Sequence, residues 1–123
     1  MDKKKIFLVE DDQFIVRAYK DSLERASFEV EVALDGVEAM EKLQNITPNL
    51  ILLDIIMPLK NGFEVLSELK SDDRLKNVPV IILSNLGQDS DIKKGKELGA
   101  VDYMVKANYS MQEVIDKIRQ YLA

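Results

Sequence analysis

The stretch Leu50-Ile51-Leu52-Leu53-Asp54 holds four consecutive apolar residues and then a carboxylate. A strand that is apolar at every position has both faces covered, which is typical of the inner strands of a parallel sheet with helices on either side. The run Val80–Leu83 has the same character and is followed by Ser84. The sequence therefore predicts two central strands, each followed by a polar residue.

Three further short apolar runs lie outside these two, and segments of helical period separate all five. Residues 28–33 and 101–105 alternate apolar and polar side chains, so we place them at the edges of the sheet. Five strand–helix units with right-handed crossovers then give an α/β fold, a doubly wound five-stranded parallel sheet of order 2-1-3-4-5, flavodoxin-like (βα)5. The predicted strands are Lys5–Val9, Phe28–Ala33, Leu50–Leu53, Val78–Leu83 and Val101–Val105.

The sequence marks the five helices with unequal clarity. The last one has a clean apolar stripe from Met111 to Leu122 and a capping box formed by Ser110 and Glu113. The fourth offers mainly Ile92 and Leu98 as apolar anchors, so we expect it to pack loosely and to be a candidate partner surface. A solvated helix face is the alternative. The other predicted helices are Asp12–Ala26, a second from Asp35, a third from Gly62, and the fourth over Gln88–Leu98.

Composition narrows the possible functions. The 123 residues suit one domain, and the net charge of −5 is the wrong sign for binding phosphate backbones or anionic lipid. The chain has no Cys and no His, which excludes disulfides, thiolate or imidazole metal sites and histidine bases, and leaves hard cations on oxygen ligands. The apolar run Ile6–Val9 is too short for a signal peptide or membrane span, so we expect a cytoplasmic protein with no direct contact to membrane or nucleic acid.

Polar side chains follow the predicted strands at the edge where ligands bind in open α/β sheets. Taken alone, each has an ordinary interpretation as a helix cap, a turn residue, a loop hydroxyl or a solvated strand end. Together, carboxylates, a hydroxyl and an ammonium compose a site for a divalent cation and a phosphoryl group. These residues are Glu10, Asp11 and Asp12 after the first strand, Asp54 after the third, Ser84 after the fourth and Lys106 after the fifth.

Charge repulsion decides how such a site would work. Clustered carboxylates repel one another, so without a cation at least one should have a raised pKa, and Mg²⁺ would relieve the conflict. Lys106 and Ser84 could then contact the oxygens of a phosphoryl group. Asp54 ends the central strand and is the candidate nucleophile.

Competing enzyme classes lack their motifs in this chain. There is no glycine-rich nucleotide-binding turn after the first strand and no G-x-S-x-G hydrolase motif. A phosphohydrolase of the haloacid dehalogenase type places a second Asp two residues after its nucleophile, where this chain has Ile56. A phosphohydrolase acting on small phosphate esters is kept as an alternative, and a constitutive scaffold with a vestigial site as a third.

These motifs closely resemble the receiver domains of two-component response regulators over essentially the whole chain. The resemblance rests on the acidic run at 10–12, on Leu53–Pro58 with Gly62 beyond it, on Ser84, and on Gly99–Tyr103 leading to Lys106. It implies a phosphorylation switch rather than an enzyme with turnover. The phosphoryl donor would be a histidine kinase or a histidine phosphotransfer protein.

The resemblance also implies roles for single residues. Asp54 would be the phosphoacceptor and would bind Mg²⁺ with Glu10, Asp11 and the backbone carbonyl of Ile56. Lys106 and Ser84 would contact the phosphoryl group, with Ser84 and Tyr103 as the switch pair. Ile56 and Leu86 would flank the path of the hydrolytic water, and their apolar side chains predict slow hydrolysis. The run Glu10-Asp11-Asp12 allows two registers for the metal pair; we assign Glu10 and Asp11 and leave Asp12 to cap the helix.

Two further expectations follow from the family pattern. The family usually has Lys-Pro with a cis peptide bond where this chain has Lys106-Ala107, so either the fold bears a costly non-proline cis bond or the loop differs. The chain ends at Ala123, directly after the last predicted helix. We therefore expect residues 1–123 to form a stand-alone, chemotaxis-regulator-like receiver that contacts a downstream protein through its fourth helix, fifth strand and fifth helix.

Overall fold

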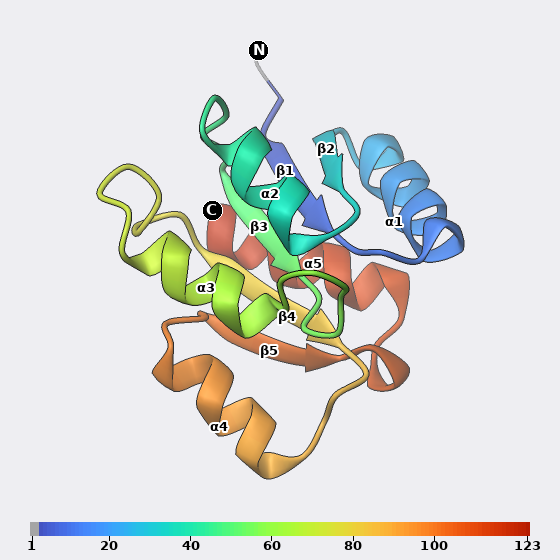
Figure 1. Ribbon diagram of the computed structural model, residues 1–123. Coiled ribbons are helices and arrows are strands. Elements are labelled where there is room, and N and C mark those ends of the chain that lie inside the picture. The colour runs from blue at the N-terminus through green and yellow to red at the C-terminus, as the bar shows by residue number, and fades with distance from the viewer. Residues whose placement is uncertain (1–2) are drawn as a thin grey trace.

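The computed structural model describes residues 3–123 and contains five strands and five α-helices in strict alternation (Figure 1). The strands are β1 (Lys5–Val9), β2 (Glu29–Ala33), β3 (Leu50–Leu53), β4 (Val80–Ser84) and β5 (Asp102–Val105). The helices are α1 (Gln13–Arg25), α2 (Gly36–Leu43), α3 (Gly62–Lys70), α4 (Asp89–Glu97) and α5 (Met111–Leu122), with a short 3-10 turn at Lys106–Asn108. None of the helices among residues 3–123 is long and apolar enough to cross a membrane.

The five strands are parallel and lie in the order β2-β1-β3-β4-β5, which confirms the predicted doubly wound sheet. β2 and β5 are the edges, as their alternating sequences predicted. Val9 pairs with Leu53, so β1 and β3 end side by side. The residues that follow, Glu10 and Asp54, are therefore brought to the same end of the sheet.

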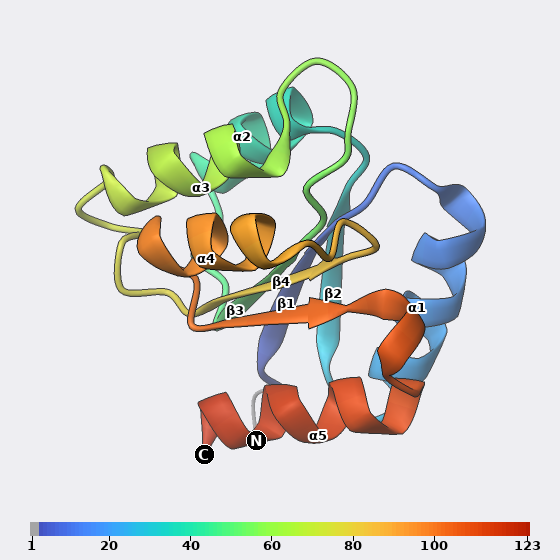
Figure 2. The ribbon, with the colours of Figure 1, turned by 90° about the horizontal axis from the view of Figure 1, so that it is seen from below.

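Helices α2, α3 and α4 cover one face of the sheet, and α1 and α5 cover the other (Figure 2). Alternate residues of β3 supply the two cores: Ile51 and Leu53 face α2 and α3, whereas Leu50 and Leu52 face α1 and α5. This explains why the central strands are apolar at every position.

Side-chain caps fix where the helices begin. The Asp12 carboxylate accepts hydrogen bonds from the backbone N–H groups of Phe14 and Ile15, at 2.9 and 3.2 Å, so it caps α1 as predicted. Ser110 and Glu113 form the predicted capping box of α5. Asp12 thereby holds α1 beside the end of β1.

β1 and β3 have the predicted bounds, whereas β2, β4 and β5 differ from the predictions by one or two residues. β4 starts at Val80 rather than Val78, because Pro79 has no N–H to give to the ladder. It ends at Ser84, one residue later than predicted, because Ser84 pairs with Val105. No peptide bond among residues 3–123 is cis. Of the two alternatives for Lys106–Ala107, the structure therefore shows the second: the loop differs from the family pattern and forms a 3-10 turn.

Helix α4 is as poor in apolar anchors as predicted, and Gly95 is its one buried residue. A Cβ atom at Gly95 would lie 2.6 Å from Ile82 Cδ1 and 2.9 Å from Tyr103 Cδ2. The glycine thus lets the α4 backbone rest directly on β4 and β5. Ile92 and Leu98 are partly buried and pack against the same core.

Candidate functional site

The polar residues that follow the strands meet in one pocket of about 250 Å³ at the carboxyl edge of the sheet. The structure brings together every residue predicted from the strand ends. The pocket is lined by Glu10, Asp11, Asp12, Ile15, Asp54, Ile56, Ser84, Asn85 and Lys106. Four of the five strands contribute to it.

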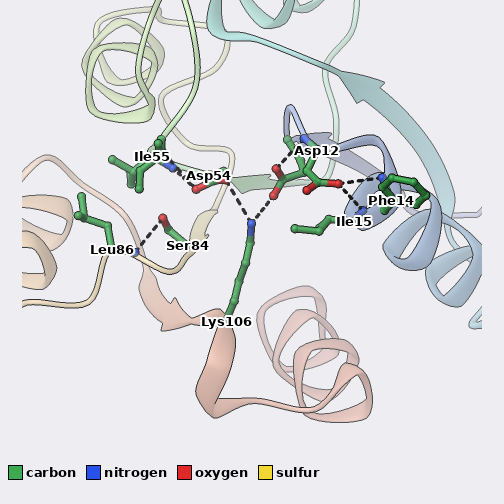
Figure 3. Close-up of polar contacts among 10 residues, drawn as sticks. Asp12, Phe14, Ile15, Asp54, Ile55, Ser84, Leu86 and Lys106 are labelled. Atoms are coloured by element: carbon green, nitrogen blue, oxygen red, sulfur yellow. Dashed lines mark hydrogen bonds and ion pairs between the residues drawn. The ribbon is translucent and has the colours of Figure 1, made fainter.

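Lys106 reaches from the end of β5 to two carboxylates (Figure 3). Its Nζ donates to Oε1 of Glu10, and it lies 3.2 Å from Oδ2 of Asp54. Burial opposes the charge on the ammonium, but the hydrogen bond to Glu10 and the negative charge of Asp54 outweigh it, and the pKa of Lys106 is raised. Lys106 is therefore a permanent cation beside Asp54.

Glu10 is buried, with 2% of its surface exposed. Burial raises the pKa of Glu10 from its ordinary value of 4.5 to about 7, although hydrogen bonds from Lys106 and from the Asp12 backbone N–H oppose the change. The charge of Asp54 raises this pKa by a smaller amount. The predicted raised carboxyl pKa is thus found, but burial contributes more to it than repulsion between carboxylates.

Asp54 is 7% exposed, and its two carboxylate oxygens have different hydrogen-bond partners. Oδ1 accepts hydrogen bonds from the backbone N–H groups of Ile55 at 2.7 Å and Ile56 at 3.3 Å, whereas Oδ2 faces Lys106. One ligand oxygen each from Glu10, Asp11 and Asp54 lie within 4.8 Å of one another. Such a set of carboxylate oxygens suits a hard divalent cation, and the Asp12 carboxylate is engaged in capping α1.

Ser84 and Tyr103 are joined through the backbone of Leu86. Ser84 is fully buried, and its Oγ accepts a hydrogen bond from the Leu86 N–H at 3.3 Å. Tyr103 is also buried, and its hydroxyl donates to the Leu86 carbonyl. Burial, reinforced by the charges of Asp91 and Asp54, raises the pKa of Tyr103 to about 12, so the hydroxyl remains a donor at neutral pH.

Two residues that line the pocket were not predicted from the sequence, and Leu86, which was predicted to flank the path of the hydrolytic water, is not among the lining residues. The two residues are Ile15, in the first turn of α1, and Asn85, which lies between two residues with predicted roles. Ile56 lines the pocket as predicted. The Leu86 side chain packs against the core on the face of the sheet that α2, α3 and α4 cover (Figure 2). The direct signal for Asn85 was its position immediately after Ser84.

The fold and the site together define a class of protein, and comparison with known families agrees with them. The family model described as "Response regulator receiver domain" matches residues 6–119. The chain belongs to this family. One solved structure that it resembles is the chemotaxis response regulator CheY4 of Vibrio cholerae, with 27% identity and a TM-score of 0.91, covering 98% of this chain and 100% of that one. Another is the Francisella response regulator 1452 receiver domain, with 29% identity and a TM-score of 0.90, covering 98% of this chain and 97% of that one.

Curated relatives are longer proteins. The chain is 33% identical over 118 residues to the DNA-binding dual master transcriptional regulator RpaA of Synechocystis, covering 96% of this chain and 48% of that protein. It is 36% identical over 119 residues to the alkaline phosphatase synthesis transcriptional regulatory protein PhoP of Bacillus subtilis, covering 97% and 48%. The chain thus spans about half the length of these relatives.

Proposed function

We propose that this receiver domain is a phosphorylation switch in which Asp54 accepts a phosphoryl group in the presence of Mg²⁺. The observation that carries the proposal is the position of Asp54, with one carboxylate oxygen 3.2 Å from the Lys106 ammonium in a pocket that also holds Glu10 and Asp11. The donor would be a phosphohistidine on a histidine kinase or phosphotransfer protein, since none of the 123 residues is His.

Glu10, Asp11 and Asp54, with the Ile56 carbonyl, would hold the Mg²⁺ ion. The donor set fits, because carboxylate and carbonyl oxygens are the ligands that Mg²⁺ prefers, and the three carboxylates already converge. The ion would supply positive charge to phosphoryl oxygens that the acidic pocket would otherwise repel. Its charge would also offset the cost of ionising the buried Glu10.

The transfer step would use the chain's own residues as follows. A carboxylate oxygen of Asp54 attacks phosphorus in line with the phosphorus–nitrogen bond of the donor; that bond breaks, and its electron pair returns to the imidazole. Lys106 donates to one phosphoryl oxygen as charge develops there. The Ser84 hydroxyl accepts from Leu86 in this structure, so its own proton is free to donate to another phosphoryl oxygen.

Phosphorylation would then change the surface formed by α4, β5 and α5. A new hydrogen bond from Ser84 to the phosphoryl group would draw the hydroxyl toward Asp54 and so strain the bond that it accepts from the Leu86 N–H, and the Leu86 carbonyl is the acceptor of Tyr103. Tyr103 in turn lies against Gly95 of α4. The switch pair is thus in contact with α4, and a downstream protein that binds this surface would detect the change. A cytoplasmic location and stand-alone action remain predictions.

Labelling with acetyl phosphate tests the proposal against the phosphohydrolase alternative. We expect one phosphoryl group per chain with Mg²⁺, none with EDTA, and no multiple turnover of a small ester such as p-nitrophenyl phosphate. The absence of a second Asp at position 56 supports this outcome. Sustained ester turnover would favour the phosphohydrolase, and failure to label under any condition would favour the scaffold.

A further inference from the structure

Asn85 is an exposed residue of the pocket to which neither the fold nor the proposed transfer step gives a role. It directly follows the buried Ser84 at the end of β4. We infer that the Asn85 carboxamide holds the water that hydrolyses the acyl phosphate on Asp54, and so sets how long the phosphorylated state lasts. The inference rests on the proposed function of Asp54.

The direction of attack limits which residues could hold that water. Hydrolysis needs a water in line with the bond between Asp54 and phosphorus, on the side of phosphorus away from the carboxylate. Asp54 is almost fully buried, so this side is the one that opens to solvent. Ser84 is completely buried and belongs to the floor of the pocket, whereas Asn85 and the 58%-exposed Ile56 belong to its open side.

The other polar groups of the pocket are engaged elsewhere. Glu10 is buried and accepts from Lys106, and the Asp12 carboxylate caps α1. Asp11 is assigned above to the cation. The Asn85 side chain has no hydrogen-bond partner among residues 3–123, so both its carbonyl oxygen and its NH₂ group are free. The oxygen of a primary amide can accept a hydrogen bond from a water and so hold it in place.

The backbone around Asn85 is fixed on both sides. Ser84 is paired with Val105 in the sheet, and the N–H and carbonyl of Leu86 bond to Ser84 and Tyr103. The backbone that bears the Asn85 amide is therefore fixed by hydrogen bonds, and a residue that positions a water needs such a rigid support. Leu86, by contrast, directs its side chain into the core rather than into the pocket.

In the proposed step, the oxygen of the water bonds to phosphorus while the bond from phosphorus to the Asp54 oxygen breaks, and its electron pair stays on the carboxylate. The water's hydrogens leave with the phosphate, which then loses one to solvent at neutral pH. Asn85 forms no covalent bond and ends the step unchanged. It is therefore a positioning residue.

The test compares the decay of phospho-Asp54 in the parent, Asn85→Ala and Asn45→Ala, after labelling with acetyl phosphate in Mg²⁺ and removal of the donor. We expect decay about tenfold slower in Asn85→Ala, which corresponds to about 1.4 kcal/mol of barrier, and a rate within about twofold of the parent in Asn45→Ala. Asn45→Ala is the matched control because it makes the same chemical change at an exposed position that does not line the pocket.

Beryllofluoride binding, followed by NMR, provides a readout that does not depend on hydrolysis. We expect Asn85→Ala to bind beryllofluoride with Mg²⁺ as tightly as the parent, since the amide acts on the water. Equal or faster decay in Asn85→Ala would overturn the inference, as would a loss of beryllofluoride affinity as large as the change in decay. If the parent takes up no label, the proposed function is refuted. If all the proteins are labelled and decay at the same rate, only the inference about Asn85 is refuted.

Discussion

Glu10→Gln should stabilise the protein at pH 8 in the absence of divalent cations, although it removes a charged partner of Lys106. The folded protein binds a proton at Glu10 with a pKa of about 7, against 4.5 for an ordinary carboxyl. Between these two pH values the folded state keeps a proton that the unfolded state has released. The contribution of Glu10 to stability is therefore fully present below pH 4.5 and is lost as pH rises through about 7.

The size of the effect follows from the same two values. A tenfold difference in proton affinity corresponds to about 1.4 kcal/mol. A carboxyl that titrates at about 7 when folded and at 4.5 when unfolded therefore costs the folded state roughly 3 kcal/mol once it is ionised. Gln has nearly the same shape and can still accept from the Asp12 N–H. The variant should gain up to that amount at pH 8 and almost nothing at pH 4.5.

Urea unfolding followed by circular dichroism, in EDTA at pH 4.5 and pH 8, measures the difference. The matched control is Glu41→Gln, which makes the same chemical change at an exposed position of α2. We expect the control to behave like the parent at both pH values. A Glu10→Gln protein that is no more stable than the parent at pH 8, or that gains equally at both pH values, would refute the reasoning.

Three other perturbations test separate parts of the account. Gly95→Ala should lower the free energy of unfolding, measured in urea, by roughly 1–2 kcal/mol. The new methyl group would lie 2.6 Å from Ile82 Cδ1, and the gain in helix propensity offsets only part of that clash. Unchanged stability would show that α4 does not rest on this glycine. Lys106→Ala should retain or slightly strengthen Mg²⁺ binding, measured by calorimetry, while losing the structural response to beryllofluoride. An intact response would show that Lys106 has no part in the switch and is only a solvated residue at the end of a strand. Beryllofluoride should change amide hydrogen exchange in α4, β5 and α5, and changes confined to α2 would contradict the proposed output surface.

Much of this fold could be predicted from the sequence, because the position of a strand in a parallel sheet restricts which residues the strand can contain. Strands covered on both faces must be continuously apolar, which identified β3 and β4 as central, and the alternation in β2 and β5 identified the edges. Parallel strands end at one edge, so the residues after them meet there. Glu10, Asp54, Ser84 and Lys106 were predicted together for that reason.

The features that escaped prediction depend on packing between segments far apart in the chain. Nothing in the sequence indicated the role of Gly95, because only the folded position of Tyr103 shows that this glycine permits close contact. The inward turn of the Leu86 side chain depends on the core below it, so the sequence could not show that this side chain would be absent from the pocket lining. The raised pKa of Glu10 was expected from repulsion, but its main cause is burial, which requires the folded structure.

Mapping the phosphorylated residue tests the central claim most directly. The parent, Asp54→Asn and Asp12→Asn are incubated with acetyl phosphate, with Mg²⁺ or with EDTA, and the adduct is located by mass spectrometry. Asp12→Asn is the matched control, because Asn caps a helix as well as Asp does and the Asp12 carboxylate is bound to the start of α1. The account predicts Mg²⁺-dependent label on Asp54 in the parent and in Asp12→Asn, and none in Asp54→Asn. Label on another residue, undiminished label in Asp54→Asn, or equal label in EDTA would contradict it.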